Sequence, residues 1–354
     1  MNLLTDKLFM ELIKSASLAP SADNMQPWEF SRKSDSIEVF ASKKRMMPTD
    51  VSDMFTWVSI GAAMQNIVLT LARNRYRSDI KYPSHEKPDQ PVAIITVSQG
   101  YADGRLAEWI PARSTNRSNY ENTPPGDDMI SYLTRSIEGL EAGIYWVTDP
   151  GKFRMVASLD ARSSFIRLEH KPTHDELFNV LRFSRKQMLD TRYGLDYESL
   201  GVPAVAVFIA RQLQHWSVNR LVSKSGIGRL VAKMLSMKLV RAGGLCLITA
   251  KQRDPEGYMK AGRAMEQLWL AASSEGLSIH PYGALPQYLT KAELEPGTFL
   301  PSHLAIIKRH RDPFYSIFPG AEKEYPAIVL RAGLAGKASA RSDVRLRSEE
   351  IVRK

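Results

Sequence analysis

The chain has a single cysteine, Cys246, among its 354 residues. One thiol cannot form an intrachain disulfide, and it cannot supply a cysteine-based metal site. The sequence also lacks any run of about 18 uninterrupted apolar residues, so we expect no membrane-spanning helix. Because Asp6, Lys7, Glu11 and Lys14 interrupt the N-terminal apolar stretch, we expect no signal peptide and a cytoplasmic protein.

Acidic residues are absent from the window between Arg211 and Arg241, which has seven lysines and arginines. This window accounts for most of the net charge of +10. Its only aromatic residue is Trp216, whereas nucleic-acid-binding surfaces usually combine a basic face with interleaved aromatic residues. We therefore expect no nucleic-acid partner.

The overall composition is that of a globular protein, with 44% hydrophobic and 24% charged residues. A chain of this length is at the upper limit for one hydrophobic core, which favours two domains or one domain built from two halves. Periodicity predicts helices from about 5 to 19, 56–74, 128–138, 153–189 and 255–276, and strands at 37–42, 92–98, 143–148, 204–210, 245–250 and 327–332.

Two of the predicted helices resemble each other. One reads WVSIGAAMQNIVLTLARNRY and the other reads MKAGRAMEQLWLAASSEGLS, and both contain the pattern G-x-A-M-x-(N/Q) inside an apolar helix. The two copies lie about 200 residues apart, which suggests a duplicated unit whose copies pair within one chain.

A polar loop follows the first helix, with the sequence APSADNMQPW. Ser21, Asn24 and Gln26 supply hydrogen-bond donors and acceptors, and two prolines restrict the backbone. Such a loop suits a planar heterocycle with carbonyls and ring nitrogens. A capped turn with incidental polar residues is the alternative interpretation.

Two further segments are basic. Arg113 and Arg117 lie four residues apart with hydroxyl side chains between them, a pattern that can bind a phosphate. Arg345, in the C-terminal stretch RSDVRLR, could close on the same phosphate. A solvated loop and a disordered basic tail are the alternatives.

Together these segments resemble the FMN-dependent nitroreductase family. PSADNMQPWEF is similar to the P-S-x-x-N-x-Q-P-W loop of that family, and RSTNR is similar to its R-x-S/T-x-R phosphate motif. GRAMEQLWLAASSEGLSIHPYG resembles the central helix and the flavin-facing loop, and RSDVRLRSEEIV resembles the closing tail. The resemblance implies an α+β fold.

The order of the motifs resembles the fused tandem branch of this family, because the Q-P-W loop precedes the phosphate arginines by about 90 residues. That branch implies two degenerate nitroreductase-like halves, here 1–104 and 105–354, forming an intramolecular pseudo-dimer. One complete flavin site per chain is then expected, in a monomer or a weak homodimer.

The resemblance also implies roles for particular residues. The FMN phosphate would be bound by Arg113, Thr115, Arg117 and Arg345. The ribityl chain and ring would contact Ser21, Asn24 and Gln26. The ring near N5 would face Pro281, Tyr282 and Gly283, although family members often have an acidic residue where this chain has Tyr282.

The expected activity is transfer of hydride or electrons through FMN, from NADH, NADPH or another donor to a small organic acceptor. We expect no metal site, and no side chain is identified as a catalytic acid or base. Non-catalytic FMN binding or sequestration, and an electron-transfer partner docked on the basic window, are alternatives. The window itself, with Leu230, Val231, Met234 and Leu235 on one stripe, could be a lid over the flavin, a solvated helix or a membrane-surface helix.

Overall fold

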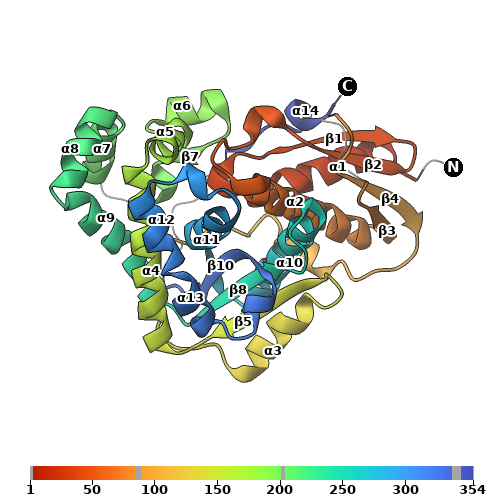
Figure 1. Ribbon diagram of the computed structural model, residues 1–354. Helices are drawn as coiled ribbons and strands as arrows, with labels where there is room; N and C mark the ends of the chain where they lie inside the picture. Colours follow the sequence, from red (N-terminus) through yellow and green to blue (C-terminus); the bar gives the residue numbers. More distant parts are fainter. Residues whose placement is uncertain (1–2, 84–88, 201–203, 337–343, 354) are drawn as a thin grey trace.

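The computed structural model describes residues 3–83, 89–200, 204–336 and 344–353 (Figure 1). Within these ranges the chain forms two four-stranded antiparallel sheets with helices around them, and the expected α+β class is confirmed. One sheet is built from residues before position 100 and the other from residues after position 140. A two-stranded parallel pair, β6 with β7, is separate from both.

The N-terminal region contributes α1 (Asp6–Ser17), β1 (Trp28–Lys33), β2 (Ser36–Ala41), α2 (Met54–Arg73), β3 (Tyr76–Lys81) and β4 (Ala93–Gln99). The remainder contributes α3 (Asp127–Ser136), β5 (Ala142–Val147), α4 (Pro150–Glu169), α5 (Lys171–Val180), β6 (Leu181–Arg182), α6 (Arg185–Thr191), β7 (Leu195–Asp196), α7 (Ala204–Leu213), α8 (Trp216–Lys224), α9 (Ile227–Ser236), β8 (Gly244–Ala250), α10 (Pro255–Ser274), β9 (Ser278–Tyr282), α11 (Ala284–Leu294), α12 (Pro301–Lys308), α13 (Arg311–Ile317), β10 (Tyr325–Gly333) and α14 (Ser348–Ile351).

The two large sheets share one topology. Their strand orders are β1-β2-β4-β3 and β5-β8-β10-β9, which is first, second, fourth, third along the chain in both cases. All neighbouring strands in them are antiparallel. For each sheet, a long helix connects the second and third strands in chain order: α2 follows β2, and α10 follows β8.

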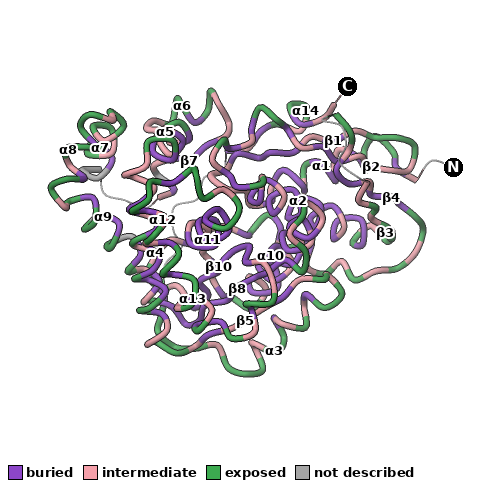
Figure 2. Tube along the Cα trace, in the orientation of Figure 1, coloured by how far each residue is buried: buried purple, intermediate pink, exposed green. Residues whose placement is uncertain are grey.

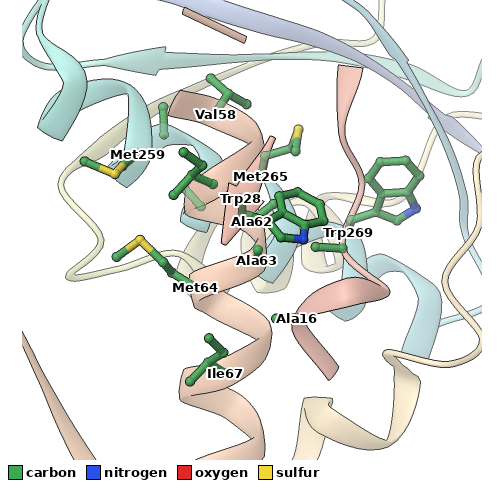
Figure 3. Packing of buried hydrophobic residues seen from close by; sticks show 14 of the residues in the cluster. Ala16, Trp28, Val58, Ala62, Ala63, Met64, Ile67, Met259, Met265 and Trp269 are labelled. Atoms are coloured by element: carbon green, nitrogen blue, oxygen red, sulfur yellow. The ribbon is translucent and has the colours of Figure 1, made fainter. Parts of the chain in front are cut away.

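The long helices α2 and α10 pack directly on each other between the sheets (Figures 1 and 3). A Cβ at Gly61 would lie 1.9 Å from the carbonyl oxygen of Met259, and a Cβ at Gly262 would lie 2.0 Å from that of Val58. Gly61 thus meets Met259, three residues before Gly262, and Gly262 meets Val58, three residues before Gly61. This contact is reciprocal, and it requires glycine because backbone atoms occupy the space of a side chain.

Apolar side chains around this crossing form the largest core cluster. Figure 3 shows Val58 and Ala62 of α2 among Met259, Met265 and Trp269 of α10. Figure 2 shows that α2, α10, α11 and the second sheet are rich in buried residues. Because the core is continuous across the crossing, the two sheets share one hydrophobic interior.

Most of the predicted elements are confirmed, and local signals explain them. The first helix begins after Thr5, whose hydroxyl accepts a hydrogen bond from the Leu8 amide at 3.2 Å. Cys246 is buried in β8, as a small core residue.

One predicted strand is wrong. Residues 204–210 form the first part of helix α7, and Phe208 and Ile209 are exposed. A short apolar run does not distinguish a buried strand from a helix by its periodicity. In the structure this segment is helical and packs against helix α8.

One helical stretch of the described chain, Val51–Arg73, is long and apolar enough to cross a membrane by length and composition. The apolar window within it is 83% buried inside the protein, as in the central helix of a core.

The C-terminal segment returns to the first sheet. Val352 forms a parallel bridge with Phe30 of β1, and the Arg353 amide donates a hydrogen bond to the Phe30 carbonyl at 2.8 Å. The tail thus connects the end of the chain to β1, the strand that follows the polar loop.

Candidate functional site

A cavity of about 250 Å³ is lined by residues from the N-terminal region and from the remainder of the chain. Its polar wall includes four arginines from distant parts of the sequence: Arg113, Arg117, Arg167 and Arg345. Its apolar wall comes from α2, α10 and β10: Phe55, Val58, Met265, Trp269 and Ile328. Eight of the ten residues that the sequence predicts as flavin contacts line this cavity: Ser21, Asn24, Arg113, Thr115, Arg117, Pro281, Gly283 and Arg345.

The polar loop enters the cavity with an unusual backbone. Asp23, Asn24 and Gln26 all have positive φ angles, of 47°, 55° and 52°, a region that non-glycine residues rarely adopt. The Ser21 hydroxyl accepts a hydrogen bond from the Gln26 amide at 3.0 Å, and the Ser59 hydroxyl accepts one from the Ala22 amide at 3.2 Å. Strained loops of this kind are typical of binding sites, where surrounding contacts maintain them.

Asn24 joins this loop to two other walls of the cavity. Its side-chain nitrogen donates to the Gly194 carbonyl at 3.2 Å and to the Val344 carbonyl at 3.5 Å. The Gly194 amide in turn donates to the Asn24 carbonyl at 3.3 Å. One asparagine thus connects the polar loop, the segment at 194 and the C-terminal tail.

Gln26 does not line the cavity, although the sequence predicts a flavin contact there. It is fully buried and accepts a hydrogen bond from the Leu346 amide at 2.9 Å. Its side-chain nitrogen donates to the Arg192 carbonyl at 2.9 Å. Gln26 therefore secures the C-terminal tail beside Arg345, and its effect on the cavity is indirect.

Arg113 is buried and oriented by three groups. Its Nε lies 3.3 Å from a carboxylate oxygen of Glu266, its Nη2 donates to the Leu18 carbonyl at 2.9 Å, and its guanidinium lies 4.5 Å from the centre of the Trp269 ring. Burial raises the pKa of Glu266 to about 7, and the nearby Arg113 opposes that rise. These contacts fix the guanidinium at the cavity wall.

Thr115 and Arg117 are positioned by the edge of the second sheet. Thr115 forms a parallel bridge with Ile279 of β9, and the Asn116 amide donates to the Ile279 carbonyl at 3.1 Å. The Arg117 guanidinium donates to the Ser199 carbonyl at 3.1 Å, and burial lowers its pKa. Sheet pairing thus determines where this basic segment meets the cavity.

The end of β9 and the residue after it supply another part of the cavity wall. Pro281 and Gly283 line the cavity, but Tyr282 does not, and its ring lies 4.5 Å from that of His280. Burial raises the pKa of the Tyr282 hydroxyl well above its usual value. A Cβ at Gly283 would lie 2.5 Å from the Phe55 ring, so a larger residue there would require the Phe55 side chain to shift.

Sequence reasoning missed the part of the wall between 167 and 199. Arg167, on α4, forms an ion pair with Asp23 of the polar loop at 2.9 Å. On α5, Glu176 accepts hydrogen bonds from the Thr49 amide at 2.7 Å and from its hydroxyl at 2.6 Å. No local signal distinguishes these residues from other charged positions of a helix, because their partners lie more than a hundred residues away.

The structure gives no support to the lid interpretation of the basic window. Among the described residues, none from 211–241 lines the cavity. The helices of this window pack on α4 instead, at the left of Figure 1. The side chains of Val231 and Leu235 lie outside the described part of the chain. The described residues also contain no cluster of potential metal ligands.

No family model matches the chain. It is 21% identical over 322 residues to a Serratia protein named "Probable NAD(P)H nitroreductase PigM", covering 86% of this chain and 89% of the relative. It is also 21% identical over 326 residues to an uncharacterized protein of Mycobacterium tuberculosis, covering 91% of this chain but 45% of that protein. This chain thus spans less than half the length of the mycobacterial relative.

Two solved structures also match in part. A nitroreductase with bound FMN from Desulfitobacterium hafniense aligns with a TM-score of 0.36 and 13% identity, over 67% of this chain and 94% of that one. The FMN-dependent nitroreductase NfnB from Mycobacterium smegmatis, in complex with NADPH, aligns with a TM-score of 0.36 and 12% identity, over 66% and 88%. The name of the Serratia relative supports the nitroreductase resemblance of the motifs.

Proposed function

We propose that this chain is an FMN-dependent oxidoreductase of the nitroreductase type, with NADH or NADPH as electron donor and a small organic molecule as acceptor. The observation that carries the proposal is the convergence of four arginines on one cavity that also has an apolar wall with Phe55 and Trp269. A phosphorylated, planar ligand complements both features. The Serratia relative that matches 86% of the chain is named as an NAD(P)H nitroreductase.

The residues of the cavity fit FMN. Arg113, Thr115, Arg117 and Arg345 would bind the phosphate. Ser21 and Asn24 would contact the ribityl chain and the ring, and Pro281 and Gly283 would lie along the ring. When bound, FMN would supply hydride acceptance and electron transfer. The work of the chain is to bind and orient this ligand and to exclude water from the apolar wall.

We also propose that the two halves, 1–104 and 105–354, form an intramolecular pseudo-dimer. Three features support this arrangement: the shared strand order, the equivalent positions of α2 and α10, and the reciprocal glycine contacts. The polar loop comes from the first half and the phosphate arginines from the second, so one chain assembles one full site. We expect one FMN per chain, in a monomer or a weak homodimer; two FMN molecules per chain would contradict the proposal.

Titration with FMN and riboflavin tests the site. Arg117→Ala should weaken FMN binding by about 1.5–3 kcal/mol, the scale of a charge-assisted hydrogen bond. Riboflavin affinity should hardly change, because riboflavin lacks the phosphate. Arg135→Ala, at an exposed position in the last turn of α3, is the control. Equal losses for the two ligands would show that Arg117 does not contact the phosphate.

Anaerobic addition of NADH or NADPH tests the activity. Bleaching of the bound flavin, and its recovery when an acceptor is added, are expected for the oxidoreductase. A flavin that binds tightly but is reduced by neither nicotinamide would favour the sequestration alternative.

A further inference from the structure

Helices α7, α8 and α9 form an arm at one edge of the molecule, which we call the helical arm (residues 204–236). Figure 1 shows it at the left, away from both large sheets. It packs on the rest of the protein mainly through contacts of α8 and α9 with α4. Among the described residues the helical arm and the turn after it contain eight of the fifteen exposed large hydrophobic side chains: Phe208, Ile209, Val218, Leu221, Ile227, Leu230, Met234 and Met237.

Helix α8 buries two small polar residues and exposes two of its apolar residues. Asn219 and Ser223 are buried, and the Asn219 side chain donates to the Leu168 carbonyl at 2.8 Å. Leu221 is 72% exposed and Val218 is also exposed. An ordinary surface helix has the opposite pattern, with its apolar stripe facing the core.

Helix α9 has the same inversion. Its small residues Gly228, Ala232 and Ser236, spaced four apart, are buried. The Ser236 hydroxyl donates to the Asp160 carboxylate of α4 at 2.6 Å, and a Cβ at Gly228 would lie 3.0 Å from the Phe165 ring of α4. Leu230 and Met234, in contrast, are 59% and 65% exposed. A folded chain that buries glycine and serine and exposes leucine and methionine has a surface for a partner.

Exposed cations lie on the same helices as these apolar side chains. Arg220 and Lys224 on α8, and Arg229 and Lys233 on α9, are exposed. The window from 211 to 241 has no aspartate or glutamate to balance them. The partner is therefore both apolar and negatively charged.

We propose that the helical arm docks the protein on the surface of an anionic lipid bilayer. Such a surface offers negative headgroups to the cations and an acyl boundary to leucine, isoleucine and methionine side chains. A second copy of the chain fits this face poorly, because a two-fold contact would oppose two uncompensated clusters of positive charge. This function is separate from the cavity, since no described residue of 211–241 lines it.

Co-sedimentation of the full chain with vesicles tests the proposal. Vesicles of phosphatidylglycerol and phosphatidylcholine should bind the protein, pure phosphatidylcholine vesicles should not, and added salt should release it. Arg220→Glu/Lys224→Glu should weaken binding at least about 25-fold, given about fivefold for each cation near the surface. Leu221→Ser/Leu230→Ser/Met234→Ser should weaken it at all salt concentrations.

Matched controls change the same chemistry elsewhere. Lys43→Glu/Lys44→Glu alters the same charge at exposed positions outside the helical arm, and Leu294→Ser/Leu300→Ser alters exposed leucines near α11 and α12. Both should keep wild-type binding. Failure of the parent protein to bind anionic vesicles, or equal losses in variants and controls, would overturn the proposal. Self-association of the protein that the arm variants abolish would overturn the proposal in favour of a second copy of the chain. Retention of the protein on polyglutamate without vesicle binding would overturn it in favour of an acidic protein partner.

Discussion

The reciprocal contact between α2 and α10 makes a strong prediction about Gly262→Ala. In an unconstrained helix this change is stabilising by about 0.8–1.0 kcal/mol, because alanine is the better helix former. Here the new Cβ would lie 2.0 Å from the Val58 carbonyl oxygen, whereas ordinary contacts begin near 3.4 Å. The backbones must separate by more than 1 Å, since neither atom belongs to a flexible side chain.

Separating two packed helices strains the surrounding core, and such overpacking costs about 1–3 kcal/mol or more. We therefore expect a lower free energy of unfolding, the opposite sign to the propensity effect. Val58, Met265 and Trp269 also line the cavity, so the same shift should weaken FMN binding. Urea denaturation and FMN titration measure the two effects.

The partner glycine provides an internal check. Gly61→Ala should be destabilising to a similar extent, because its Cβ would lie 1.9 Å from the Met259 carbonyl oxygen. The double variant should cost less than the sum, since the first substitution already separates the helices. Gly297→Ala, with nothing within 4 Å of its Cβ, should change stability by less than about 0.5 kcal/mol. Single variants as stable as the parent, or more so, would refute the close crossing.

Two further predictions concern buried polar groups. Burial raises the pKa of Asp160 to about 6 from 3.8. Folding favours the protonated carboxyl. The contribution of Asp160 to the free energy of unfolding is therefore fully present below pH 3.8, and about 3 kcal/mol of it is lost as the pH rises through 6. Asp160→Asn should therefore flatten the fall in unfolding free energy between pH 4 and 6, measured with urea at several pH values; an unchanged slope would contradict this assignment. Gln26→Ala should cost about 1–3 kcal/mol, because it leaves the Leu346 amide and the Arg192 carbonyl without this partner. It should also lower FMN affinity by loosening the tail at Arg345, and an FMN affinity equal to that of the parent would show that the tail is held by other contacts.

Local sequence signals were sufficient for much of the fold. Apolar periodicity predicted α1, α2 and α10, and the paired G-x-A-M patterns indicated that α2 and α10 are related. These features depend on neighbours within a few residues, so the sequence alone displays them. The polar loop was likewise identifiable, because its amides and prolines are contiguous.

Other outcomes depended on contacts between distant segments. The apolar run 204–210 has the composition of a strand, yet it is part of α7. The amide of Gln26 was expected to face the flavin, but it binds the tail at Leu346, 320 residues away. Arg167 reaches the cavity through Asp23, 144 residues earlier, and nothing in its local sequence marks it.

The basic window shows most clearly what the sequence determines and what the tertiary structure determines. Its charge and its helical periodicity follow from the order of residues alone. The order of residues does not determine which face of each helix is buried. Periodicity defines an apolar stripe, but not whether that stripe faces the core or the solvent. Only packing against α4 decided that Asn219 and Ser223 of α8 and the small residues of α9 face inward while Leu221, Leu230 and Met234 face outward. Burial is a property of the assembled tertiary structure, and the sequence of one segment does not contain it.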